Sequence, residues 1–291
     1  MTQLTRRRVL EALGLGAIVV PFGTTLLGCS SDESPGDPVD ASPQSDAAID
    51  SPGGDTCGPA AAAWAMGGTA AMTAKACYPE PFAQAITTCP LVMCATTAGP
   101  CTTATTPARQ DVSEGYPGLP VRLALKIVTA ETCVPVAGAV VEIWHTQATG
   151  VYSGVTPSPG FCSGGDVDAP NHDYFRGTQT TDASGRVDFD TCFPGWYPGR
   201  AIHIHVRVTV GATDYLVSQL FFDQALTQQI FATHPTYMPE GQPNTTNSSD
   251  GVLAGAPIGP YVLDTSRMSD GAMLASKVIA LRSAAQANCS T

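Results

Sequence analysis

One short segment of the chain gathers side chains that could hold a metal ion. Tyr197 offers a phenol, Arg200 a fixed cation, and His203 and His205 two imidazoles, all between positions 197 and 205. The run 201–210 alternates along its length and is rich in β-branched residues, so it predicts a strand. Because alternate side chains leave a strand on the same face, both imidazoles would point the same way. The segment therefore predicts half of a coordination sphere.

A second segment upstream completes a recognisable pattern. The residues that carry it keep a fixed order along the chain: Trp144, Gly150, Tyr152, Gly195, Trp196, Tyr197, Arg200, His203 and His205. In this order they resemble the intradiol ring-cleavage dioxygenase family, which includes protocatechuate 3,4-dioxygenase and catechol 1,2-dioxygenase. The resemblance spans residues 117–265, and within it 175–185 and 241–250 are similar to the exported branch of the family.

The resemblance implies a non-haem Fe(III) ion with solvent in an open position. The implied ligands are two tyrosinates and two histidines: Tyr152, Tyr197, His203 and His205. The chemistry of these groups agrees, because ferric iron is a hard acid that favours anionic oxygen donors. Its charge would drive a phenol, with a free pKa of about 10, into the phenolate form.

The resemblance also implies a reaction. A catechol-type aromatic diol would bind the iron through both oxygens and displace Tyr197, which then helps to take up a substrate proton. O2 would open the ring between the two hydroxylated carbons to give a muconate-type diacid. Arg200 would stabilise the charge that builds on the ring, and Gln219 would lie near the iron behind the ligands. The implied catalytic residues are thus Arg200, Tyr197 and Gln219.

Each of these residues has a simpler explanation when it is taken alone. A histidine pair on a strand can be two hydrogen-bonded polar groups, and tyrosines often pack in the core of a sandwich. Two other functions therefore stay open: a non-catalytic lipoprotein β-sandwich that binds a ligand or a surface polymer, and an oxidase with copper at the two histidines. We expect His145, His172 and His234 to be structural or pocket-wall groups, with His172 as the candidate substrate contact among them.

The hydrophobic pattern predicts the fold class. From Pro117 onward, short alternating apolar runs separated by turn residues are typical of an all-β fold, an antiparallel β-sandwich. The expected strands are 121–128, 139–144, 186–189, 201–210 and 214–222. The tail 266–291 predicts a C-terminal helix, and 60–66 predicts a short helix inside a cysteine-rich extension, 57–116. That extension would cover one edge of the sandwich or form a dimer contact.

The N-terminus carries export signals. Residues 1–28 combine consecutive arginines at 6–8 with an apolar run and a lipoprotein cleavage box that ends at Cys29. A retained anchor helix is the alternative, but the apolar run is short for a bilayer and is interrupted by Pro21. We expect an exported protein that is lipid-anchored at the cell envelope through Cys29. Residues 29–56, rich in Ser, Asp, Pro and Gly, predict a disordered tether.

The cysteine content also indicates an oxidising compartment. The chain has 10 cysteines, and if Cys29 carries lipid the odd remainder leaves at least one outside intramolecular disulfides. The pairing stays open at this stage. Zinc at Cys89, Cys94 and Cys101 is the alternative to disulfides, but their spacing fits no standard ligand pattern.

Charge and domain content limit the partners. The formal net charge of −11 argues against nucleic acid, whose phosphates need clustered Lys and Arg. The expected partners are a small aromatic diol, O2 and, through the lipid, a membrane. The chain lacks the helical dimer domain of catechol dioxygenases, so we expect a homo-oligomer of a different kind. Its link from Tyr197 to His203 is shorter than in protocatechuate-cleaving relatives, which leaves the ring substituents of the substrate open.

Overall fold

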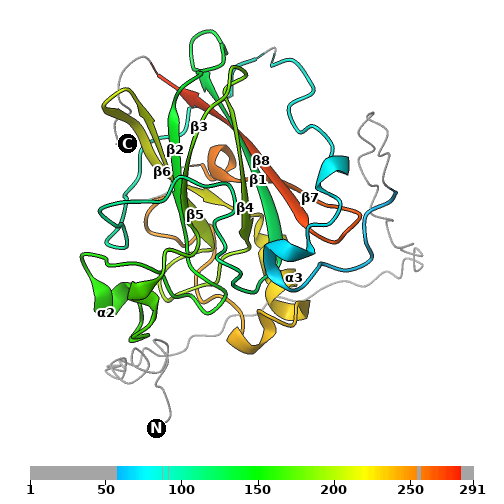
Figure 1. Cartoon of the computed structure of the whole chain (residues 1–291), viewed down its shortest axis with the longest axis vertical. Coiled ribbons are helices and arrows are strands. Elements are labelled where there is room, and N and C mark those ends of the chain that lie inside the picture. The colour runs from blue at the N-terminus through cyan, green and yellow to red at the C-terminus, as the bar shows by residue number, and fades with distance from the viewer. Residues whose placement is uncertain (1–57, 87, 91, 254–256, 283–291) are drawn as a thin grey trace, which may run out of the picture.

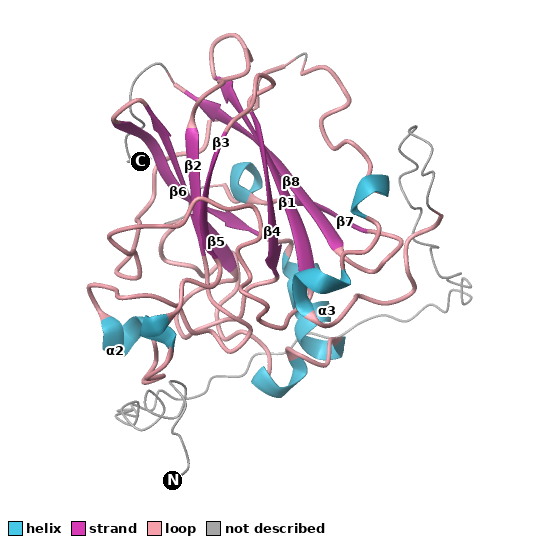
Figure 2. Ribbon diagram, in the orientation of Figure 1, coloured by secondary structure: helices cyan, strands magenta, loops and turns pink. Residues whose placement is uncertain are grey.

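The computed structural model describes residues 58–86, 88–90, 92–253 and 257–282, and its centre is a sandwich of two four-stranded sheets (Figures 1 and 2). One sheet has the strand order β4-β1-β8-β7, and the other has β3-β2-β5-β6. The strands are β1 (Pro120–Thr129), β2 (Val140–Trp144), β3 (Arg176–Thr180), β4 (Arg186–Cys192), β5 (His203–Val210), β6 (Thr213–Phe221), β7 (Asp264–Arg267) and β8 (Met273–Leu281). The predicted β-sandwich is confirmed.

Helices are few and short in the described residues. The α-helices are α2 (Pro159–Cys162) and α3 (Gln224–Thr233), and the 3-10 turns are η1 (Gly68–Ala71), η2 (Lys75–Cys77), η3 (Ala169–Asn171), η4 (Met238–Glu240) and η5 (Gly259–Tyr261). Asp223 caps α3, because its carboxylate accepts a hydrogen bond of 2.9 Å from the amide of Leu226. Ile230 and Phe231 then anchor α3 to the core. None of the helices in this part of the chain is long and apolar enough to cross a bilayer.

The predicted C-terminal helix is wrong, because residues 273–281 form β8. This strand lies between β7 and β1, and it pairs with β1 in parallel from Val121↔Met273 to Thr129↔Leu281. The other strand pairs are antiparallel. A strand with neighbours on both sides and side chains buried on both faces reads as a nearly continuous apolar run. Its spacing can therefore be mistaken for that of a buried helix.

The predicted helix at 60–66 is also absent from the structure. Its backbone is used in another way: the amides of Ala61 and Ala65 donate to the carbonyls of Met268 and Gly271, at 3.0 and 2.8 Å. The segment thus runs along the turn between β7 and β8, and Trp64 packs under the guanidinium of Arg267 at 4.9 Å. This places it at the edge of the sandwich formed by β7, one of the two placements expected for the extension.

The two faces of the β3-β2-β5-β6 sheet have different roles. Its inner face contributes aliphatic side chains to the core against those of β1: Val141, Ile143, Ile204, Val206 and Val208 face Val121, Leu123, Leu125 and Ile127. By strand alternation its outer face carries Trp144, His203 and His205. At these three residues the outer face is buried as well. It is the face on which the candidate site lies.

Disulfides tie the extension to the sandwich. The cysteines bonded in disulfides are Cys77, Cys89, Cys94, Cys101, Cys133 and Cys162. Cys89 pairs with Cys133, and Cys101 pairs with Cys162. For these residues the disulfide prediction is confirmed over zinc. In the described chain Cys192 has a free thiol, which is buried.

The predicted signal peptide and tether lie outside the described residues. The same is true of Cys29, with its expected lipid, and of Cys57 and Cys289.

Candidate metal centre

Strand β5 places its two histidines near the C-terminal end of β2. In the register of the two strands, His205 lies opposite Trp144. The indole stacks on the imidazole of His205 with ring centroids 4.7 Å apart and ring planes at 5°. His203 is two residues before His205 on the same strand, so both rings project from the same face of the sheet.

Two loops bring the tyrosines to these histidines. The Nε2 atoms of His203 and His205 are 3.1 Å apart, and the hydroxyls of Tyr152 and Tyr197 each lie 3.3 Å from His203 Nε2. The two hydroxyls are 3.4 Å from each other. All four side chains are buried. The structure therefore gathers two phenol oxygens and two imidazole nitrogens at one point, which is the set of residues that the family resemblance implied.

A glycine allows the two tyrosine loops to touch. Gly150 has φ of 78°, and a Cβ on it would lie 2.0 Å from the carbonyl oxygen of Trp196. Any larger residue would push the loop of Tyr152 away from the loop of Tyr197. The close approach continues at Gly195, whose amide donates to the carbonyl of Gln147 at 3.2 Å.

Hydrogen bonding sets the direction of the His203 lone pair. Its Nδ1 lies 2.7 Å from the carbonyl oxygen of Ala201 and must donate to it, so Nε2 carries the lone pair toward the cluster. Burial, with a contribution from Arg200, lowers the pKa of His203 well below its usual value, and burial with the nearby His203 does the same for His205. Both imidazoles are therefore neutral, as metal ligands must be.

These residues fit a ferric ion. Burial, followed by the neighbouring Tyr197, raises the pKa of Tyr152 well above its usual value, so only a strong cation would draw off its proton. The donation from His203 to a backbone carbonyl is the arrangement that orients metal-bound histidines. Among the described residues no three His, Cys, Asp or Glu side chains come together as a metal site. A site at this cluster consequently depends on its phenols, the donors that a hard cation prefers.

Arg200 is fixed beside the cluster. Its Nε lies 3.0 Å from Oδ2 of Asp250, and its Nη2 donates to Oε1 of Gln219. Gln219 in turn donates to the carbonyl of Thr97 at 3.1 Å. Arg200 and Gln219 thus contact each other, while the roles that the resemblance implied for them stay predictions.

Asp250 is the residue that sequence reasoning missed. Its side chain is fully buried and also accepts hydrogen bonds from the amides of Ala201 and Val252, at 2.8 and 2.9 Å. In the sequence, Asp250 stood out only as the last residue of the segment 241–250. Nothing in that segment indicated that it contacts Arg200.

The three histidines outside the pattern make ordinary hydrogen bonds. His145 is buried between the carbonyl of the next residue, at 2.8 Å, and the hydroxyl of Thr191, at 2.7 Å, and burial lowers its pKa to about 4. His172 lies 3.1 Å from the carboxylate of Asp168. His234 Nε2 meets a backbone carbonyl of the N-terminal extension at 3.0 Å. These contacts are structural, as expected for the group; the idea that His172 touches substrate stays a prediction.

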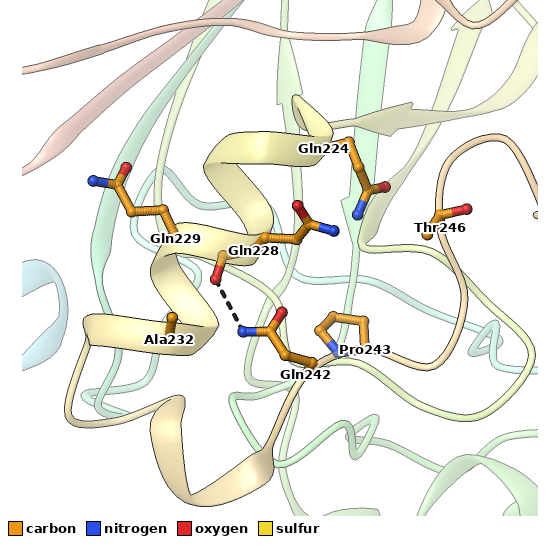
Figure 3. A pocket seen from close by; sticks show the side chains of 7 residues that line it. All are labelled: Gln224, Gln228, Gln229, Ala232, Gln242, Pro243 and Thr246. Atoms are coloured by element: carbon orange, nitrogen blue, oxygen red, sulfur yellow. Dashed lines mark hydrogen bonds between the residues drawn. The ribbon is translucent and has the colours of Figure 1, made fainter. Parts of the chain in front are cut away.

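A shallow hollow beside α3 differs in character from this cluster. Its volume is about 510 Å³, and it is lined by Gln224, Gln228, Gln229, Ala232, Gln242, Pro243 and Thr246. Figure 3 shows the side chain of Gln242 reaching the backbone carbonyl of Gln228, which it meets at 3.0 Å. None of the lining side chains titrates, and the glutamines and Thr246 offer only neutral hydrogen-bonding groups, so the hollow offers no acid or base chemistry.

Comparisons with known proteins point to the same family as the resemblance in the sequence. Residues 95–237 match the family model described as Dioxygenase. The fold is similar to that of an intradiol ring-cleavage dioxygenase from Tetranychus urticae, with 28% identity and a TM-score of 0.58 over 66% of this chain and 94% of that one.

Curated relatives match over a shorter span. Chlorocatechol 1,2-dioxygenase from Pseudomonas putida is 26% identical over 114 residues, which cover 33% of this chain and 40% of the relative. The enzyme of the same name from Rhodococcus opacus is 26% identical over 108 residues, covering 31% and 38%. The chain therefore spans less than half the length of these relatives. The span of the family model contains all four clustered side chains and Arg200.

Proposed function

We propose that the chain is an intradiol ring-cleavage dioxygenase, and that it opens a catechol-type aromatic ring with O2 to give a muconate-type diacid. We place the reaction at a non-haem Fe(III) ion. Its ligands would be the four clustered side chains: Tyr152, Tyr197, His203 and His205. The observation that carries the proposal is the convergence of their donor atoms at 3.1 to 3.4 Å inside the protein. The curated relatives point to aromatic diols as the substrate class.

Bound iron would supply a Lewis acid that draws the phenols and the substrate hydroxyls into their anionic forms. The chain's own residues would orient the ligands of the iron and shield the site from bulk water. Ala201 holds the His203 ring through its carbonyl, and Trp144 stacks on His205, so both imidazoles have one orientation. Burial of the cluster excludes bulk water, which strengthens every charge interaction within it.

The two tyrosines would have different roles. Tyr152 is 1% exposed, whereas Tyr197 is 6% exposed and lies under the partly exposed ring of Phe161. Tyr197 is therefore the better placed of the two to leave the metal and accept a proton from an incoming diol. Tyr152 would stay as the permanent phenolate ligand.

Arg200 would stabilise negative charge on the ring. Asp250 and Gln219 fix its guanidinium before any substrate binds, so little reorganisation is needed when charge develops. Gln219 would act by holding Arg200, because its side-chain oxygen is occupied by that residue.

We also propose that the protein acts outside the cytoplasm, lipid-anchored at the cell envelope through Cys29. The disulfides of the described chain support an oxidising compartment.

The test is the visible spectrum and iron content of the purified protein, before and after catechol is added without O2. We expect stoichiometric iron and a phenolate-to-iron absorption band that moves to longer wavelength with catechol, followed by a ring-opened diacid when O2 is admitted. Tyr197→Phe should shift or bleach the band and greatly reduce ring opening. Protein that stays colourless and free of iron after ferric loading would refute the proposal and favour a non-catalytic binding module. Copper in place of iron would favour the oxidase.

A further inference from the structure

We propose that the disulfide between Cys101 and Cys162 is a clamp that positions Tyr152, so that the oxidised cystine determines how firmly the site retains its metal. The inference rests on the proposed function for its metal, but its structural part concerns Tyr152 alone. It adds a positioning element to the site that lies outside the four ligands.

The cystine is built into the site. Cys101 and Cys162 are 3% and 1% exposed, and they share one buried cluster with Trp144, Tyr152 and Tyr197. This cluster is separate from the main core of the sandwich. The sulfur atoms therefore pack within the same small group of side chains as both phenols.

Hydrogen bonds from both half-cystines form a cyclic network of bonded residues that includes Tyr152. The amide of Tyr152 donates to the carbonyl of Cys162 at 3.0 Å. The carbonyl of Cys101 accepts a bond of 2.8 Å from Nη2 of Arg176, and the same nitrogen lies 2.7 Å from the carbonyl of Ser153. The path runs from Tyr152 through Cys162, the disulfide, Cys101 and Arg176 to Ser153, which is the next residue along the chain.

Arg176 makes this cyclic network rigid. Its side chain is 1% exposed, and its Nε also bonds to the carbonyl and hydroxyl of Ser153, at 3.2 and 3.1 Å. The guanidinium lies 6.0 Å from the ring centre of Tyr152. A buried cation loses much when one of its acceptors is withdrawn. The carbonyl of Cys101 therefore cannot move away without cost.

The cystine also joins the segments that flank the site. On one side of Cys101, the carbonyl of Thr97 holds Gln219. On the other side of the bond, α2 ends at Cys162 and carries Phe161, whose ring meets Tyr197 edge-on at 5.9 Å and 88°. Cys101 and Cys162 are separated by 61 positions in sequence, and α2 has only four residues. Without the covalent bond, local opening of this region should become much easier.

The chain offers a matched control. Cys89–Cys133 also ties the extension to the sandwich, but Cys133 lies in the loop before β2, whereas Trp144 ends that strand. In Figure 1 this loop lies at the opposite end of the sheet from α2. Removing Cys89–Cys133 reports the effect of losing a disulfide without disturbing Tyr152.

The experiment compares the double variants C101A/C162A and C89A/C133A with the wild-type protein. In metal-free protein, amide hydrogen exchange at Tyr152 should be about tenfold faster or more in C101A/C162A, and unchanged in C89A/C133A. In iron-loaded protein, C101A/C162A should lose iron to a chelator about 10- to 100-fold faster than the control. Its phenolate-to-iron band should also weaken. Melting temperatures of all three proteins separate these local effects from global destabilisation.

The proposal that the disulfide positions Tyr152 would be overturned if the amide of Tyr152 exchanges in C101A/C162A at the wild-type rate. It would also be overturned if exchange is accelerated equally in both double variants. If C101A/C162A does not fold, Arg176→Met decides, because a methionine fills similar space but donates no hydrogen bond to the carbonyls of Cys101 and Ser153; normal exchange at Tyr152 in that variant would overturn the inference. Wild-type protein that binds no iron would refute the proposed function. The exchange measurement, made without metal, would then still test the clamp.

Discussion

The carboxylate of Asp250 accepts both from Nε of Arg200, at 3.0 Å, and from the amide of Ala201, at 2.8 Å. It thus fixes the guanidinium and the backbone that leads into β5 with one buried group. Arg200 is two residues beyond Pro198 and three before His203, so the position of the cation and the position of the first histidine are set together.

Asp250→Asn should therefore reduce turnover while leaving the metal centre formed. The amide keeps the shape of the side chain but removes its charge and one acceptor, so Arg200 becomes less well placed to stabilise charge on the ring. We expect turnover to fall about 10- to 100-fold, with the visible band of the iron-loaded protein unchanged. Asp214→Asn is the control, since Asp214 is an exposed partner of Arg207. A lost band in Asp250→Asn would mean that Asp250 supports the ligands themselves.

Trp144 should stabilise the protein and orient His205. Its indole is fully buried between His205 and the guanidinium of Arg207, which lies 5.5 Å from the ring centre. Trp144→Ala should lower the free energy of unfolding by about 3–5 kcal/mol, because it leaves a cavity. Trp144→Phe should cost much less, since Nε1 of Trp144 has no hydrogen-bond partner among the described residues.

Urea unfolding of both variants, metal-free and iron-loaded, measures these losses. The loss in Trp144→Ala should be larger in the loaded form, because the loosened His205 also binds iron less well. Val140→Ala, on the same strand but exposed, should change little. If the unfolding free energy falls equally in the metal-free and iron-loaded forms, Trp144 does not contribute to iron binding.

Local patterns in the sequence predicted the part of the site that lies on one strand. The alternation of 201–210 was enough to place His203 and His205 on one face, because strand geometry leaves no other choice. Their meeting with Tyr152 and Tyr197 was inferred through family resemblance and is seen in the structure, while their role as ligands stays a prediction.

The features that sequence reasoning missed depend on contacts distant along the chain. β8 was taken for a helix because its partners, β1 and β7, bury both of its faces and hide the period of two. The pairing of Cys101 with Cys162 and the contact of Asp250 with Arg200 join segments whose proximity only the folded loops create.

His145 should make stability depend on pH. Burial lowers its pKa to about 4 in the folded protein, whereas an unfolded histidine has a pKa of about 6.5. The unfolded state therefore binds more protons in this range. The contribution of His145 to stability is fully present above pH 6.5 and is lost as the pH falls toward 4. The loss should reach about 3 kcal/mol.

Urea unfolding of metal-free protein between pH 7 and 4 measures this dependence. Carboxylates also titrate over part of this range, so the comparison is with His145→Gln, which can keep the bonds to Thr191 and to the carbonyl of Thr146. The variant should show the smaller decline in unfolding free energy as the pH falls. Parallel curves for the two proteins would contradict the assignment.

Gly150→Ala should dismantle the site without removing a ligand. Two effects act at this position. The backbone has φ of 78°, which strains any residue with a Cβ, and that Cβ would lie 2.0 Å from the carbonyl oxygen of Trp196. The loops that carry Tyr152 and Tyr197 must separate to relieve the clash. We expect loss of the phenolate-to-iron band, weak iron retention and an unfolding free energy lower by more than the ~1 kcal/mol that backbone strain alone produces.

Gly211→Ala separates the two effects. Gly211 has φ of 63°, but a Cβ there would meet no atom within 4 Å, and it lies in the turn between β5 and β6. This variant carries the strain without the clash, so it should lose about 1 kcal/mol of stability and keep both its iron and its band. If Gly150→Ala behaves like Gly211→Ala, the close contact of the two tyrosine loops is not what brings the phenols together.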